Sequence, residues 1–198
     1  MRSAHRVLAS VAALLLLGSC SVPTNDAPVE LSGSIVPDTT TSTSTSSPET
    51  DTREVFVYVL EQEDTGTVLR RIARTVEAGT GLQGVLNNLF TQRPNPDVEG
   101  EQELTSAIPE SAALLSASVD PSDPTLLVVD VRGLFGNEGV QGATLRNALA
   151  QIVWTATEGE PGLRVRFRQD GEPRPALVDN LESTEGAVDR DDYQRSSA

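Results

Sequence analysis

The order of strand-like and helix-like segments is the feature that most constrains the fold of this chain. Residues 54–60 (EVFVYVL) are β-branched and aromatic, which is typical of a buried strand, and residues 67–76 beyond the turn EQEDTG predict its hairpin partner. Helical periodicity and further strands then follow at about 82–90, 113–119, 125–131, 141–157 and 163–168. The order ββαββαβ predicts an α+β fold in which two helices pack on one face of a mixed or antiparallel sheet.

Each predicted helix has a single apolar face, as a helix that covers a sheet should. The first face consists of Leu82, Val85, Leu86, Leu89 and Phe90. The second consists of Leu145, Ala148, Leu149, Ile152, Val153 and Ala156.

Three glycines at the start of the first helix, Gly79, Gly81 and Gly84, match the G-x-G-x-x-G pattern of dinucleotide sites. That motif needs a preceding parallel strand within a βαβ unit, whereas the strand here is half of a predicted hairpin. We therefore interpret the segment as a structural helix start. Thr80 and Gln83 would form a capping box, and Gly84 would leave room for close packing against the sheet. No nucleotide is expected to bind.

The first 20 residues have the pattern of an export signal. Arg2 and Arg6 precede an apolar run at 7–17 that is too short to span a bilayer. The run ends in LGSC, which resembles a bacterial lipobox and implies cleavage before Cys20 and diacylation of its thiol. The alternative is an ordinary cleaved signal with a stray thiol. We expect residues 1–19 to be a signal peptide and the chain to be lipid-anchored at the extracytoplasmic face of the cell membrane through Cys20.

Composition divides the rest of the chain into three parts. Residues 20–52 are rich in Ser, Thr, Pro and acids, which predicts a disordered linker. Residues 53–178 are expected to form the folded domain, and residues 179–198 an acidic C-terminal tail. Removing residues 1–19 takes away two of the 15 arginines and none of the 29 acids, which leaves a formal net charge of −16. Such a chain is not expected to bind nucleic acid.

The residue types that are missing exclude much catalytic chemistry. After cleavage at Cys20 the chain contains no His, no Lys and no free thiol. Catalytic triads, Cys–His pairs, Schiff-base lysines and His or Cys zinc sites are therefore excluded, and we expect no cofactor and no metal. Paired carboxylates remain possible. Glu99, Glu101 and Glu103 lack the spacing of an EF-hand, so a solvated acidic loop is favoured over a Ca²⁺ site.

Two groups of residues are candidates for partner binding. Arg164, Arg166 and Arg168 alternate along one strand and predict a basic stripe on the open face of the sheet, either for an acidic partner or balanced by carboxylates such as Asp130.

The aromatic candidates are Trp154, Phe56 and Tyr58. Trp154 lies opposite the apolar face of the second helix, so it is either an exposed contact residue or covered by a loop or by the chain's own tail. Phe56 and Tyr58 belong to a strand that is apolar on both faces. That strand is either shielded inside the sheet or part of an assembly surface.

The globular part resembles the GerMN domain family. The resemblance rests on the order of VFVYVL, LRRIARTV, LQGVLNNL, TSAIP, LLVVDV, LAQIVWTAT and VRFRQDG, and on the ending VDRDDY. The chain departs from the family where the first helix runs through Gln92 and Arg93 to Pro94 instead of into Gly-Pro, and it has one copy of the domain. The resemblance implies an α+β module similar to ring-building domains of envelope machines, linked to sporulation, germination or envelope signalling, without catalytic residues.

These observations together predict a lipid-anchored, non-catalytic binding or assembly module of the cell envelope. Its partners would be envelope proteins or further copies of itself. The alternatives are an accessory cell-wall enzyme that uses paired carboxylates and a receptor domain for a small ligand.

Overall fold

The computed structural model describes residues 51–64, 66–136 and 139–196. Its strands are β1 (Thr52–Glu63), β2 (Gly66–Glu77), β3 (Leu104–Thr105), β4 (Ala113–Asp120), β5 (Asp123–Arg132), β6 (Arg164–Gln169), β7 (Glu172–Arg174), β8 (Ala176–Leu177) and β9 (Ser183–Thr184). Its helices are α1 (Gly81–Thr91), α2 (Gly142–Ala156) and the 3₁₀ helix η1 (Arg190–Ser196). The predicted signal peptide, Cys20 and nearly all of the predicted linker lie outside the described residues.

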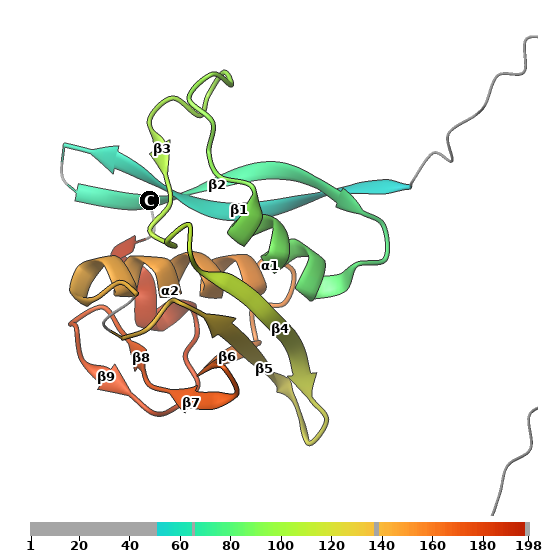
Figure 1. Ribbon diagram of the computed structural model, residues 1–198, viewed down its shortest axis with the longest axis vertical. Coiled ribbons are helices and arrows are strands. Elements are labelled where there is room, and N and C mark those ends of the chain that lie inside the picture. Colours follow the sequence, from blue (N-terminus) through green and yellow to red (C-terminus); the bar gives the residue numbers. More distant parts are fainter. Residues whose placement is uncertain (1–50, 65, 137–138, 197–198) are drawn as a thin grey trace, which may run out of the picture. The chain divides into compact units, whose positions relative to one another are not determined.

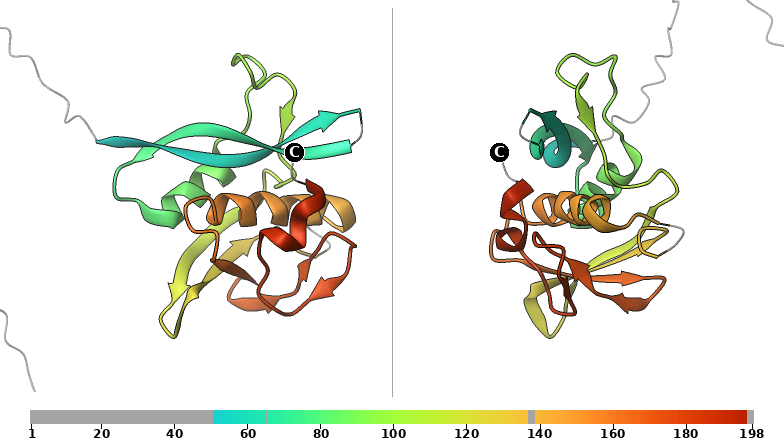
Figure 2. Two further views of the ribbon diagram at one scale, coloured as in Figure 1. Left: turned by 180° about the vertical axis from the view of Figure 1, so that it is seen from behind. Right: turned by 90° about the vertical axis from the view of Figure 1, so that its left-hand side faces the viewer.

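The α+β fold is confirmed, but the strands form two main sheets with the helices between them (Figure 1). A three-stranded sheet has the order β2-β1-β3, and a mixed four-stranded sheet has the order β4-β5-β6-β7, in which β5 and β6 are parallel. Helix α1 contacts β1, β2 and β4, and helix α2 contacts β1 and β6. Both views in Figure 2 show the β1–β2 hairpin and the four-stranded sheet on opposite sides of the helices.

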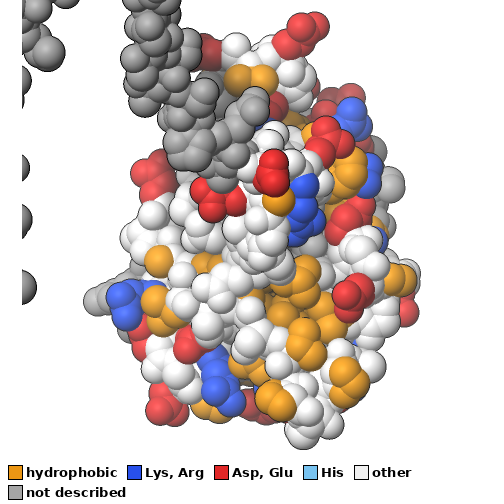
Figure 3. Space-filling model, turned by 90° about the vertical axis from the view of Figure 1, so that its right-hand side faces the viewer, with side chains coloured by type: hydrophobic (Ala, Val, Ile, Leu, Met, Phe, Trp, Pro, Cys, Tyr) orange, Lys and Arg blue, Asp and Glu red, His pale blue; other side chains and the backbone are white. Residues whose placement is uncertain are grey.

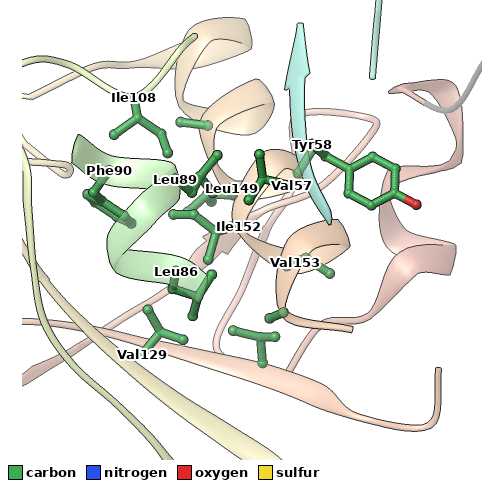
Figure 4. Packing of buried hydrophobic residues seen from close by; sticks show 14 of the residues in the cluster. Val57, Tyr58, Leu86, Leu89, Phe90, Ile108, Val129, Leu149, Ile152 and Val153 are labelled. Carbon is green, nitrogen blue, oxygen red and sulfur yellow. The ribbon is translucent and has the colours of Figure 1, made fainter. Parts of the chain in front are cut away.

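The core lies where the two helices meet both sheets (Figure 4). Leu86 and Leu89 of α1 pack with Leu149 and Ile152 of α2, and all four side chains are at most 2% exposed. The predicted apolar faces are thus the buried ones. Burial of one such side chain contributes about 1.5–3 kcal/mol to the hydrophobic stabilisation.

The predicted capping box at the start of α1 is wrong. Thr80 has helical backbone angles (φ −71°, ψ −5°), whereas a capping residue needs an extended backbone. Its hydroxyl donates to the carbonyl of Glu77 at 2.9 Å and caps no helical N–H. The predicted role of Gly84 also needs correction, because a Cβ there would collide with the Cβ of Thr80. Gly84 makes room for Thr80, and not for the sheet.

Residues 179–196, which the sequence sets apart as an acidic tail, pack against the domain; we call them the C-terminal strap. Val188 exchanges two backbone hydrogen bonds with Val165 of β6, at 2.7 and 2.9 Å. Tyr193 is fully buried, and Asp179 accepts a hydrogen bond from Arg146 of α2 at 2.8 Å. Helix η1 contacts α2, and the left view of Figure 2 shows it crossing one end of that helix. The strap is therefore part of the fold.

Candidate functional site

The structure brings the three aromatic candidates together at one end of α2. The rings of Tyr58 and Trp154 lie 5.3 Å apart at 57°. Tyr58 is buried and Trp154 half-buried, because the β1–β2 hairpin covers the side of α2 that the helical period alone would leave open. The backbone N–H of Tyr58 donates to the Thr155 hydroxyl at 3.0 Å, which fastens β1 to α2.

Arg190 of the C-terminal strap covers this aromatic pair. Its guanidinium lies 4.5 Å from the Trp154 ring centre and 5.6 Å from that of Tyr58. It donates to the Trp154 carbonyl at 3.0 Å and to the Thr157 hydroxyl at 2.7 Å. Of the two alternatives for Trp154, cover by the chain's own tail is the arrangement found.

Glu158, just beyond α2, joins three parts of the chain. Its carboxylate accepts hydrogen bonds from the Tyr58 hydroxyl at 2.6 Å, from Arg71 of β2 at 2.6 Å and from Arg190 at 3.0 Å. Arg71 also stacks on the ring of Phe56, 3.3 Å from its centre. The side chains of Phe56, Tyr58 and Trp154 therefore serve intramolecular contacts, and their binding of a partner stays a prediction.

The pKa values of this cluster follow from its contacts. Burial alone would raise the pKa of Glu158, but hydrogen bonds from Tyr58, Arg190 and Arg71 outweigh it and hold the pKa below its ordinary value. Burial, together with the hydrogen bond to Glu158, raises the pKa of Tyr58. Glu158 is therefore ionised and Tyr58 neutral at physiological pH.

Sequence reasoning missed Arg71, Glu158 and Arg190. The hairpin register offered one signal, since Arg71 lies directly opposite Tyr58 on β2. Glu158 and Arg190 belong to segments without a hydrophobic period, and only the folded chain brings them together.

The arginine stripe lies on the outer face of the four-stranded sheet, as expected. Arg164, Arg166 and Arg168 are exposed, while Leu163, Val165 and Phe167, which alternate with them, are at most 2% exposed on the helix side. Arg164 pairs with Asp123 at 3.1 Å, and Arg168 lies opposite Asp130 of β5. A shallow hollow of about 230 Å³ on this face is lined by Ser116, Ser118, Val119, Asp120, Pro121, Val128, Asp130 and Arg168.

The acidic loop is solvated at Glu99 and Glu103, which are exposed, but not at Glu101. Glu101 is 8% exposed. One of its carboxylate oxygens accepts hydrogen bonds from Arg74 and from the backbone N–H of Asn95, both at 2.9 Å. The other oxygen accepts a second hydrogen bond from Arg74. The hydrogen bond from Arg74 is the main cause that lowers the pKa of Glu101. The part of the chain that the structure describes contains no group of three or more His, Cys, Asp or Glu arranged to hold a metal.

Low pH should weaken the stabilising hydrogen bonds and ion pairs of Glu101 and Glu158. Glu101 and Glu158 have lower pKa values folded than the ordinary 4.5, so their stabilisation is complete above about pH 4.5 and is lost as the pH falls through their folded pKa values. We expect the double variant E101Q/E158Q to be less stable than the wild type at neutral pH and to lose less stability between about pH 5 and pH 3. Urea unfolding at several pH values measures this; equal losses in the two proteins would contradict it.

A wide hollow of about 850 Å³ bears on the two alternative functions. It is lined by Gln62, Glu63, Asp64 and Glu103 at the turn of the β1–β2 hairpin. An acid–base pair needs one carboxyl group shielded from water, but these three carboxylates are exposed. A receptor pocket for a small ligand is mostly apolar, and this hollow is not. Neither alternative gains support from it.

The chain is similar to known proteins in both sequence and structure. A family model described as "Germane: Sporulation and spore germination" matches residues 23–175. The tandem GerMN domains of the sporulation protein GerM from Bacillus subtilis align with a TM-score of 0.49 at 17% identity, covering 72% of this chain and 46% of that one. The first GerMN domain of the same protein aligns with a TM-score of 0.47 at 13% identity, covering 71% of this chain and 99% of that one.

A putative lipoprotein from Clostridium perfringens aligns with a TM-score of 0.37 at 13% identity, covering 75% of this chain and 94% of that one. No curated protein matches the chain. The chain spans about half the length of the tandem-domain structure. Because the family model covers most of the sequence, the chain belongs to the Germane family of sporulation and spore germination, whose domain is the GerMN domain.

Proposed function

We propose that this protein is a lipid-anchored, extracytoplasmic, non-catalytic module that binds an acidic partner of the cell envelope during sporulation or germination. The binding surface is the outer face of the four-stranded sheet. The single observation that carries the proposal is the exposed stripe of Arg164, Arg166 and Arg168 on that face of a strongly acidic chain.

The geometry of the stripe suits a carboxylate or phosphate partner. Arginine presents a planar fork of N–H donors that binds such groups in pairs. Arg164 already binds Asp123, whereas Arg166 and Arg168 lie opposite Val128 and Asp130 and project from the exposed face. Both helices pack against the opposite face and leave this one to a partner.

The anchor rests on the sequence around Cys20. A diacylated thiol would hold the protein at the membrane far more firmly than one acyl chain. The linker at 20–52 would place the domain on the order of 30 Å from the membrane. Among the described residues, no helix has the length and apolar character needed to cross a membrane.

Photo-cross-linking in intact cells tests the proposal. A photoreactive residue at Pro173, which lies opposite Arg168, should give adducts with an envelope component, whereas one at the exposed Thr75 of β2 should give none. Replacing Cys20 with Ala should let a high-salt wash, which screens charge contacts, release the protein from the membrane fraction, whereas the anchored parent should stay. Equal adducts from both positions would contradict the binding face, and retention of Cys20→Ala in the membrane after the high-salt wash would contradict the anchor.

A further inference from the structure

The shallow hollow beside the arginine stripe contains side chains whose hydrogen-bonding groups are not used within the fold. Its lining includes Arg168 of β6 and Ser116 and Ser118 of β4. Among the residues that the structure describes, none of these three side chains forms a hydrogen bond or an ion pair. Within the same residues Arg166, which lies opposite the half-buried Val128 of the hollow, forms none either. The hollow therefore offers guanidinium and hydroxyl groups to a bound molecule.

Carboxylates lie next to these groups. In the register of the sheet, Asp130 of β5 lies between Ser116 and Arg168, and Asp120 also lines the hollow. Figure 3 shows a similar mixture on the side of the molecule that it views, where basic side chains are interspersed with acidic ones. The whole chain has a formal net charge of −14, so a partner that is acidic all round would be repelled. The bound molecule must place acidic groups on the arginines and neutral hydrogen-bond donors on the carboxylates.

Hydroxyl groups meet this requirement, because a hydroxyl both donates and accepts hydrogen bonds. A hydroxyl can donate to Asp130, whose oxygens accept, among the described residues, the backbone N–H of Gly171 at 3.0 and 3.2 Å and no other donor. Hydroxyl groups can also exchange hydrogen bonds with Ser116 and Ser118. The side-chain carboxylates of an acidic peptide only accept, so they would find no donor at Asp120 or Asp130.

The sheet below the hollow disfavours binding of a peptide through its backbone. Strands β5 and β6 are interior strands, each with a neighbouring strand on both sides, so their backbone groups are used in the sheet. Side chains therefore make the binding surface. Pro121 and Val128 add an apolar area to the hollow, against which the C–H groups of a sugar ring can pack.

We propose that the acidic partner at the arginine face is an anionic glycan, a sugar chain that carries carboxylate or phosphate groups. Its acidic groups bind Arg166 and Arg168. Its hydroxyl groups bind Ser116, Ser118 and Asp130 in the hollow. Alternate residues of a strand are about 6.6–6.8 Å apart, so the two arginines hold two acidic groups of a chain that runs along β6. The inference rests on the proposed function, because it uses the same arginines, and it adds the chemical class of the partner.

Four polymers of matched chain length test the inference by isothermal titration calorimetry with the Cys20→Ala chain. Polygalacturonate and dextran phosphate carry acidic groups on a sugar chain, poly-L-glutamate carries acidic groups without hydroxyls, and dextran carries hydroxyls without acidic groups. We expect at least one of the two acidic glycans to bind at least about tenfold more tightly than both poly-L-glutamate and dextran. The tighter of the two acidic glycans identifies the acidic group as carboxylate or phosphate.

Two matched double variants test the role of the hollow. S116A/S118A removes both hydroxyl groups from it, and S111A/S183A makes the same change at two exposed serines that do not line it. Loss of two hydrogen bonds should weaken binding of the acidic glycan at least about fivefold for S116A/S118A, whereas S111A/S183A should bind like the parent. Binding of poly-L-glutamate should be the same for all three proteins. Urea unfolding, expected to match the parent because the removed hydroxyls have no partners in the described part of the chain, checks that the variants are folded.

Several outcomes would overturn the inference. Binding of poly-L-glutamate as tight as that of the acidic glycans would make the partner an acidic polypeptide. Equally tight binding of dextran, no binding of any polymer up to about 1 mM, or equal glycan binding by S116A/S118A and S111A/S183A would also overturn it. The proposed arginine face would be contradicted by a different result, which is that R166E/R168E binds cell envelopes as well as R53E/R70E does.

Discussion

Replacing Tyr193 with Ala is expected to lower the free energy of unfolding by about 3–5 kcal/mol, the usual cost of deleting a buried aromatic ring. Tyr193 is 0% exposed and belongs to the hydrophobic core, although it lies in the C-terminal strap. Loss of the ring would leave a cavity and release the strap from α2. Chemical denaturation followed by circular dichroism measures the change.

Tyr193→Phe is the matched control, because the buried Tyr193 hydroxyl has no hydrogen-bond partner among the residues that the structure describes. Removing an unpaired polar group costs nothing in hydrogen bonds, so this variant should be as stable as the wild type or more stable. A small loss for Tyr193→Ala would mean that the strap is not part of the cooperative unit. A large loss for Tyr193→Phe would mean that the hydroxyl is bonded.

The second large effect is expected at Gln151. This side chain is 0% exposed and bridges α2 to two other segments. Its amide N–H donates to the Tyr58 carbonyl at 3.1 Å, and its oxygen accepts the Ala107 N–H at 2.8 Å. Gln151→Leu removes both bonds inside the core, and each buried group left unpaired costs about 1–3 kcal/mol.

We therefore expect Gln151→Leu to lower the free energy of unfolding by about 2–5 kcal/mol. The exposed Gln83 of α1 supplies the control, since Gln83→Leu should change stability by less than about 0.5 kcal/mol. Thermal and urea unfolding measure both variants. Similar stabilities of the two would show that the bridge contributes little.

The regular elements could be predicted from the sequence because their side-chain periods are strong. The alternation from Leu163 to Arg168 places Val165 and Phe167 inside and the arginines outside, as found. The apolar faces of both helices were likewise visible. The hydrophobic periodicity determines which face of each helix or strand is buried, and it can be recognised within a short stretch of sequence.

The division into two sheets could not be predicted in the same way. The strand pattern at 54–60 indicates burial on both faces but does not say what covers each face. Helical periodicity predicts one buried face for α2, and Trp154 lies opposite that face. In the structure α2 packs against the β1–β2 hairpin on one side and β6 on the other.

The C-terminal strap escaped prediction for a related reason. Val188 and Tyr193 are isolated apolar residues among acids, so they produce no period. The burial of Glu101 could not be predicted, because its partner Arg74 is distant in sequence and Ala73 and Thr75, on either side of Arg74 in β2, are exposed. Single buried contacts between distant segments leave no local signal.

The most direct measurement of the central claim is binding of the Cys20→Ala chain to isolated cell envelopes, compared between two charge-reversed variants. R166E/R168E alters the stripe, and R53E/R70E makes the same charge change on the β1–β2 hairpin. We predict at least about tenfold weaker binding, with less dependence on salt, for R166E/R168E and unchanged binding for R53E/R70E. Equal binding of the two variants would contradict the claim that the arginine face holds the partner.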